Sequence, residues 1–202
     1  MTEELIVKAK EMFEGETPEK WFAFLELTNK SQEIQNRWWQ KLQTEVFNRE
    51  RKFHEDNPKW DWDIKIWNFW DIKWFIKGES ENERALIIHF WGDAFRIFCG
   101  DGNGSLDVEK VNELLKETKF DIIKNSIDKI YASNAQTIGW EHRNFSFNCI
   151  YDGRFPNHQT LSWYAGNKTN DFADQLIAKV RKFQTPEITA LFKEINEKCR
   201  KP

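Results

Sequence analysis

The chain has 202 residues, three cysteines and a formal net charge of -3, with 30 Lys and Arg against 33 Asp and Glu. This length suits a single domain over residues 1–202. The near-balance of charge lacks the basic excess of a dedicated duplex-binding protein, although it leaves nucleic acid open as a partner. No stretch approaches the roughly 18 consecutive apolar residues of a membrane span, so no membrane partner is expected.

The cysteines and the N-terminus indicate the cellular compartment. Cys99, Cys149 and Cys199 lie far apart, without the short spacing of a metal site. An odd number of widely spaced thiols is typical of reduced residues in a core. The N-terminus opens with acids, unlike a secretory signal peptide. We therefore expect a cytoplasmic protein.

Helices are predicted before the first strands. Thr2 can cap a helix over residues 2–13, and Gly15 is placed to end it. Thr17-Pro18-Glu19 combines a hydroxyl cap, a proline at the first helical position and an acid in the first turn, which predicts a second helix start. We expect a break at residues 29–31. Beyond it, apolar residues recur every four positions and face a core: Ile34, Trp38, Leu42 and Val46.

Between Trp60 and Ile76 large apolar residues alternate with charged ones, and only Asn68 breaks the alternation. A period of two places the apolar set on one face of a strand. A single strand of this length would span about 55 Å, so we expect a hairpin that folds near Asn68, with its even-numbered residues against the helices. This hairpin would place Trp62 opposite Trp74, Ile64 opposite Ile72, Asp63 opposite Lys73 and Lys65 opposite Asp71.

Further strands are predicted after this hairpin. Residues 85–91 and 94–99 read as two strands joined by Gly92-Asp93, a two-residue turn with glycine first. A helix starts at about Asp107, and Asp121 is placed to cap another. The alternation of apolar residues returns over residues 136–142 and 144–151.

Two helices are predicted at the C-terminal end. One carries Phe172, Leu176, Val180 and Phe183, and the other starts at Thr185-Pro186-Glu187. The fold class is therefore predicted to be α+β: an antiparallel β-meander of about six strands, with N- and C-terminal helices packed on one face.

Asp63 and Asp71-Ile72-Lys73 lie on the two strands of the first predicted hairpin. A long helix followed by a hairpin with Asp and then Asp-x-Lys resembles the core of PD-(D/E)xK metal-dependent nucleases, over about residues 34–91. The resemblance implies that Asp63 and Asp71 hold Mg²⁺ and that Lys73 stabilises charge at the attacked phosphate. No Pro-Asp precedes the pair, and Asp63-Ile64-Lys65 repeats the motif, as cross-strand ion pairing also would. We prefer solvated ion pairs without metal and keep the nuclease as an alternative.

The glycine loop Gly100-Asp101-Gly102-Asn103-Gly104 lies between a predicted strand and a predicted helix. It does not meet the G-x-G-x-x-G pattern of dinucleotide binding, and its preceding strand belongs to a hairpin. As an EF-hand loop it would lack the required glycine at its sixth position and the glutamate at its twelfth. A plain connection is the simpler interpretation.

His89 and Arg96 are predicted to face each other if the turn at Gly92-Asp93 is correct. A cation beside His89 disfavours its protonation, so we expect a neutral histidine. The pair is kept as a binding candidate, because a small-molecule-binding protein with an aromatic-lined pocket would need a few polar anchors.

Trp67 and Phe69 flank the predicted hairpin tip at Asn68. Two aromatic rings at an apex either pack under a neighbouring element or project as a contact surface. With 11 Trp in the chain, we expect a non-catalytic binding or interaction module that uses exposed aromatic surface. Its partner would be another protein or a second copy in a homodimer, and no metal or cofactor is expected.

Overall fold

A computed structural model gives the structure of the chain. It describes residues 7, 11, 12, 15, 17–56, 62–68, 71–76, 86–91, 94–99, 106–126, 137–141 and 158–201. The chain divides into two units, Met1–Asn36 and Arg37–Pro202, and each is described by itself. The first unit is smaller than the roughly 40 residues that a chain usually needs to fold alone. The single domain over residues 1–202 therefore stays a prediction.

Helix α2 runs from Pro18 to Asp56, so both units contribute residues to it. Its start is the predicted one: the backbone N–H of Lys20 donates to the carbonyl of Thr17 at 3.1 Å. Hydrogen bonds from its own backbone N–H and from the Thr17 side chain lower the pKa of Glu19. The predicted break at residues 29–31 was wrong, because this stretch contains neither Gly nor Pro, and other residues cost a helix at most about 0.7 kcal/mol each.

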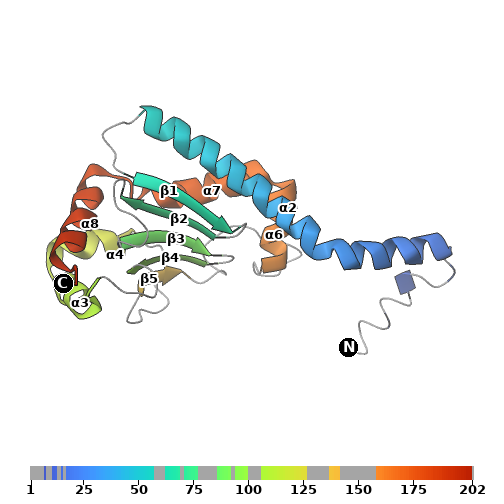
Figure 1. The fold of residues 1–202 in the computed structure, drawn as a ribbon, viewed down its shortest axis with the longest axis horizontal. Coiled ribbons are helices and arrows are strands. Elements are labelled where there is room, and N and C mark those ends of the chain that lie inside the picture. The colour runs from blue at the N-terminus through green and yellow to red at the C-terminus, as the bar shows by residue number, and fades with distance from the viewer. Residues whose placement is uncertain are drawn as a thin grey trace. The chain divides into compact units, whose positions relative to one another are not determined.

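A five-stranded antiparallel sheet follows in the described chain, with its strands in sequence order (Figure 1). Its strands are β1 (Trp62–Asn68), β2 (Asp71–Ile76), β3 (Leu86–Trp91), β4 (Ala94–Cys99) and β5 (Thr137–Glu141).

The first hairpin forms, but its predicted register was wrong by two residues. Trp62 pairs with Ile76 and Ile64 with Trp74, while Lys65 lies opposite Lys73. A register irregularity between Ile66 and Asn68 accompanies the shift, which a strict alternation does not reveal. A shift of two leaves every side chain on its predicted face but replaces the expected acid–base pairs.

The second hairpin has the predicted register. His89 pairs with Arg96, and Trp91 pairs with Ala94. The two turn residues between Trp91 and Ala94 lie outside the described residues, as does the predicted strand over residues 144–151.

The remaining helices follow the sheet or lie between its last two strands. They are α3 (Val108–Leu114), the 3₁₀ helix η2 (Thr118–Phe120), α4 (Asp121–Asn125), α6 (His158–Asn167), α7 (Thr169–Arg181) and α8 (Pro186–Lys198). Within the described part of the chain, no helix is long and apolar enough to cross a membrane.

The predicted cap at Thr185 is present and the one at Asp121 is not, while Asp107, predicted only as an approximate helix start, caps α3. Thr2 and most of its predicted helix lie outside the described residues. The Asp107 side chain accepts hydrogen bonds from the backbone N–H groups of Glu109 and Lys110, which also lower its pKa. The Thr185 hydroxyl accepts from the backbone N–H of Ile188 at 3.2 Å. Asp121 lies inside α4 and does not cap it, since the N-cap is Phe120.

The predicted fold, an antiparallel meander of about six strands with helices packed on one face, was wrong. The described sheet has five strands rather than a meander of about six, and α2 alone has 39 residues. The described regular structure is therefore mostly helical, and the fold is α+β only in the loose sense that helices accompany one antiparallel sheet. The error arose because the expected break divided α2 into two shorter helices. The strands, in contrast, are short, with five to seven residues each.

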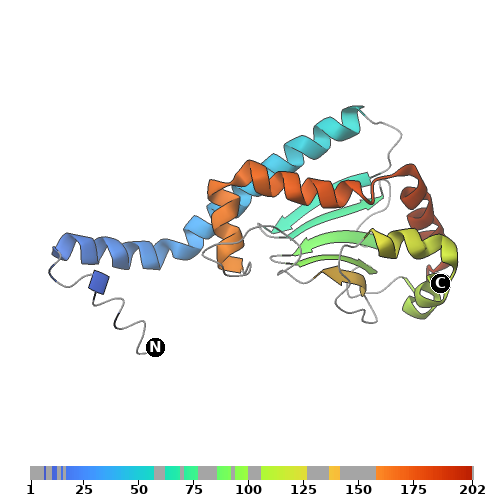
Figure 2. The same cartoon turned by 180° about the vertical axis from the view of Figure 1, so that it is seen from behind.

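The main core of the second unit lies between one sheet face and helices from both ends of this unit. Figure 2 shows α7 running along the sheet on this side. Trp39 of α2, Phe90 of β3 and Phe172 of α7 meet there, with ring centroids 5.9 to 6.2 Å apart. Fully buried side chains from the strands include Ile72, Trp74, Ile88, Phe90 and Ile97.

Helix α6 approaches α2 closely at Gly166. A Cβ atom on this glycine would lie 2.3 Å from the Trp38 ring. The Lys41 ammonium donates a hydrogen bond to the Gly166 carbonyl at 2.8 Å. The close contact between α6 and α2 therefore requires a residue without a side chain at position 166.

Candidate functional site

The first unit presents a run of exposed apolar side chains on α2. Trp21 is 42% exposed, Phe22 65%, Phe24 37% and Leu25 38%. The rings of Trp21 and Phe24 stack with centroids 5.7 Å apart and an interplanar angle of 27°. We call these four residues the aromatic segment.

The aromatic segment lies on one side of its helix. Trp21, Leu25 and Thr28 follow the spacing of one helical face, and Phe22 and Phe24 flank it. Glu19, Glu26 and Lys30 fall more than about 100° around the helix from that face. Lys20 lies about 40° around the helix from Phe24 and Glu26 about 40° from Phe22, so a charge borders the apolar stripe on each side. Leu27, which is 59% exposed, lies on the opposite side of the helix.

Sequence reasoning did not single out this surface. It placed the candidate contact surface at the hairpin tip, at Trp67 and Phe69, and left open whether these rings are packed or exposed. Trp67 belongs to β1, but its side chain, like all of Phe69, lies outside the described residues. The amphipathic pattern was visible, but a pattern cannot reveal whether anything covers it.

His89 and Arg96 lie together on the sheet face opposite the main core. Arg96 donates a hydrogen bond from Nε to His89 Nδ1 at 3.0 Å. A guanidinium can only donate, so His89 Nδ1 is the acceptor in this bond. The neutral state of His89 stays a prediction. His89 is buried, so the pair anchors the hairpin inside the protein.

Basic residues occupy successive positions across this face. Lys65 pairs with Lys73, Lys73 with His89, and His89 with Arg96, over β1 to β4. Lys73 is buried, as are Phe75 and Ile87 on the same face. The expected solvated ion-pair lattice at Lys73 was therefore wrong, because the second face of the sheet is covered as well.

The pairing does not bring Asp63 and Asp71 together. Asp63 lies opposite Phe75, whereas Asp71 lies opposite Asn68. Asp71 and Phe75 are four residues apart on β2, so the two acidic positions are separated by about 13 Å along the strands. Across the described ranges, no group of three or more His, Cys, Asp or Glu is arranged to hold a metal ion.

A buried ionic cluster joins α2 to α7. Glu50 is fully buried and accepts a hydrogen bond from Arg181 at 2.6 Å and one from Gln184 at 3.2 Å. His54 Nε2 lies 3.7 Å from the same carboxylate. The Arg181 guanidinium stacks on the Phe53 ring at 3.4 Å. The cluster therefore holds the Glu50 carboxylate in place and connects α2 to α7 and to Gln184, which follows it.

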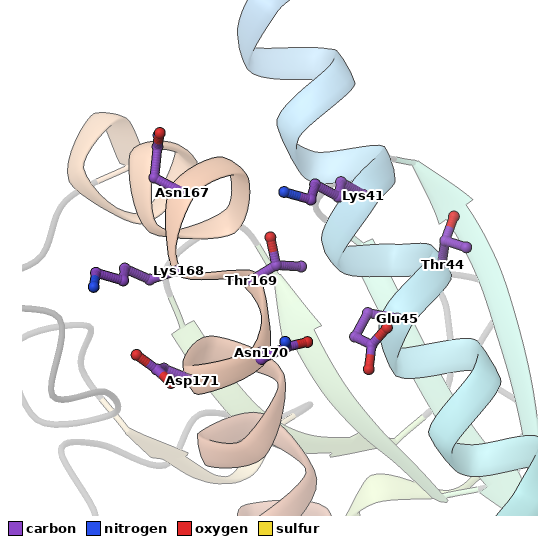
Figure 3. A pocket seen from close by; sticks show the side chains of 8 residues that line it. All are labelled: Lys41, Thr44, Glu45, Asn167, Lys168, Thr169, Asn170 and Asp171. Carbon is purple, nitrogen blue, oxygen red and sulfur yellow. The ribbon is translucent and has the colours of Figure 1, made fainter.

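A polar cavity of about 600 Å³ lies between α2 and the junction of α6 with α7 (Figure 3). Lys41, Thr44 and Glu45 line one side, and residues 167–171 line the other. Lys168 and Asp171 point away from α2 in Figure 3. Its charged side chains have both signs and do not converge on one point.

Two thiols lie within the core. Cys99 ends β4 and Cys199 follows α8, and both are free and buried. Burial, with a smaller contribution from Cys199, raises the pKa of the Cys99 thiol to about 12. A thiol that stays protonated at neutral pH is a poor nucleophile.

Comparison of the chain with protein-family models, with curated proteins and with solved structures finds no match.

Proposed function

We propose that this protein is a non-catalytic interaction module that contacts a protein partner through the aromatic segment of α2. The close grouping of four exposed apolar side chains, Trp21, Phe22, Phe24 and Leu25, within two turns of α2 carries the proposal. Large exposed rings are costly in water and are enriched at the centres of protein interfaces. An amphipathic helix that places its apolar face against another protein is a recurring recognition mode.

The other sites described above support binding rather than catalysis. Glu50 and His89 are buried, and each is hydrogen-bonded to a partly buried arginine, Arg181 and Arg96 respectively. An enzyme needs ionisable groups that converge in an accessible cleft. The reduced, buried thiols Cys99 and Cys199 fit a cytoplasmic location, which is part of this proposal.

Site-specific photo-crosslinking in cells tests this function. A photoreactive phenylalanine analogue replaces Phe22 in the full chain, and the same analogue at Ala23, on the charged side of the helix, is the control. We expect one discrete protein adduct from position 22 and none from position 23. Equal labelling from both positions, or no adduct at all, would contradict the proposal.

A further inference from the structure

We propose that His54 and Glu50 form a pH-sensitive ion pair, which strengthens the last turn of α2 when His54 takes up a proton. The two residues lie four positions apart on α2, so their side chains are neighbours on one side of the helix. His54 Nε2 lies 3.7 Å from a carboxylate oxygen of Glu50. Both residues belong to the second unit, so the ion pair does not depend on the aromatic segment.

Glu50 supplies the negative charge that favours the proton. Its carboxylate is fully buried, where water screens an opposite charge poorly. A neutral imidazole carries a single N–H, on either ring nitrogen, whereas an imidazolium carries both. Protonation therefore always presents an N–H to Glu50. At 3.7 Å the two atoms are beyond hydrogen-bond distance, so protonation should draw them together.

The position of His54 at the helix end favours the same charge. His54 lies in the last turn of α2, which ends at Asp56. The carbonyl groups of a last turn carry partial negative charge and stabilise a cation beside them. The His54 side chain is also 22% exposed, so a proton from water can reach the ring while Glu50 stays buried.

Arg181 of α7 opposes this proton, because it places a positive charge on the same carboxylate. Its guanidinium donates to one Glu50 oxygen at 2.6 Å and stacks on the Phe53 ring at 3.4 Å. His54 faces the other oxygen, to which the uncharged Gln184 amide donates at 3.2 Å. Each cation therefore has its own oxygen, and the attraction of His54 to Glu50 is not replaced by the bond from Arg181.

NMR titration of the full-length protein tests this inference. The chain has four histidines, and His54→Gln identifies the His54 imidazole signal. An ordinary histidine is half protonated at about pH 6.5. We expect the folded wild-type chain to hold the His54 proton to a higher pH than the same chain unfolded in urea, by about one pH unit. A folded midpoint at or below the midpoint in urea overturns the proposal.

Two variants separate the ion pair from a general effect of charge near His54. Glu50→Gln and Glu55→Gln each remove one carboxylate, but Glu55 is exposed and pairs with Arg51 at 3.9 Å. We expect Glu50→Gln to lower the His54 midpoint by about one pH unit, and Glu55→Gln to leave it nearly unchanged. Equal effects of the two variants contradict the proposal. If Glu50→Gln does not fold, the comparison of folded with unfolded wild type still decides.

The pH dependence of stability gives a second measurement. A proton held more tightly in the folded chain stabilises it below the unfolded midpoint, and this contribution is lost as pH rises through the folded midpoint. A difference of about one pH unit corresponds to about a tenfold change in the unfolding equilibrium constant. Urea denaturation should therefore show wild type gaining about tenfold over His54→Gln from about pH 8 to about pH 5. A ratio that does not change with pH contradicts the proposal.

Discussion

In the second unit, the stability of a polar residue depends on how deeply it is buried as well as on its hydrogen-bond partners. Glu50 is the clearest case, because a fully buried carboxylate is stable there only while Arg181 and Gln184 satisfy it. Breaking such a pair by removing one partner costs more than replacing both, since it leaves an uncompensated charge in the interior.

The Glu50–Arg181 pair gives a prediction for a double-mutant cycle. Arg181→Leu should lower the free energy of unfolding by about 3–5 kcal/mol, because it strands the Glu50 carboxylate. Adding Glu50→Gln should restore part of that loss, since a neutral amide costs less to bury. Urea denaturation of the two single variants and the double variant measures the coupling. Simple additivity of the two losses would contradict this account.

The Cys99 thiol gives a prediction for alkaline pH. Its pKa is raised from 9.0 to about 12 by burial and by Cys199. Above pH 9 the thiol ionises in the unfolded chain but stays protonated in the folded one, so its contribution to stability is complete below pH 9 and declines toward pH 12. The difference in unfolding free energy between wild type and Cys99→Ala should therefore shrink over this range. A constant difference would show that the thiol titrates normally.

Elements pack through a few positions where the backbone comes close. Helix α6 meets α2 where Gly166 leaves room for the Trp38 ring, and a Cβ atom would lie 2.3 Å from it. The helix cap at Thr185 and the second hairpin were predictable, because each depends on residues adjacent in sequence. The contact between Gly166 and Trp38 was not, because it joins residues more than 120 positions apart.

Gly166→Ala tests this packing. The added methyl group must displace the Trp38 ring or separate the two helices, so we expect a loss of about 1–3 kcal/mol despite the better helix propensity of alanine. The matched control is Ala165→Gly one residue earlier, which removes a buried methyl group instead of adding one. A thermal midpoint for Gly166→Ala at or above that of wild type would show that the interface has room to spare.

For the whole molecule, the sequence showed which residues share one face of a helix or strand, but it did not show whether another element covers that face. Alternation placed Ile72 and Trp74 on the core face correctly, and the even spacing of Leu42 and Val46 indicated a packed helix side. The register of the first hairpin was missed because a local irregularity shifts pairing without changing the faces. The aromatic segment has the same amphipathic pattern as the buried half of α2, and only the structure shows that its rings are exposed.

The free energy of unfolding of a variant that lacks the Phe22 and Leu25 side chains tests most directly whether the aromatic segment is surface or core. Phe22→Ala with Leu25→Ala removes apolar bulk at no cost in helix propensity, and Phe172→Ala in the main core is the reference. At concentrations too low for self-association, the double variant should unfold within about 0.5 kcal/mol of wild type, whereas Phe172→Ala should lose about 3–5 kcal/mol. A loss in the double variant as large as that of Phe172→Ala would assign both side chains to a core and contradict their role as an interaction surface.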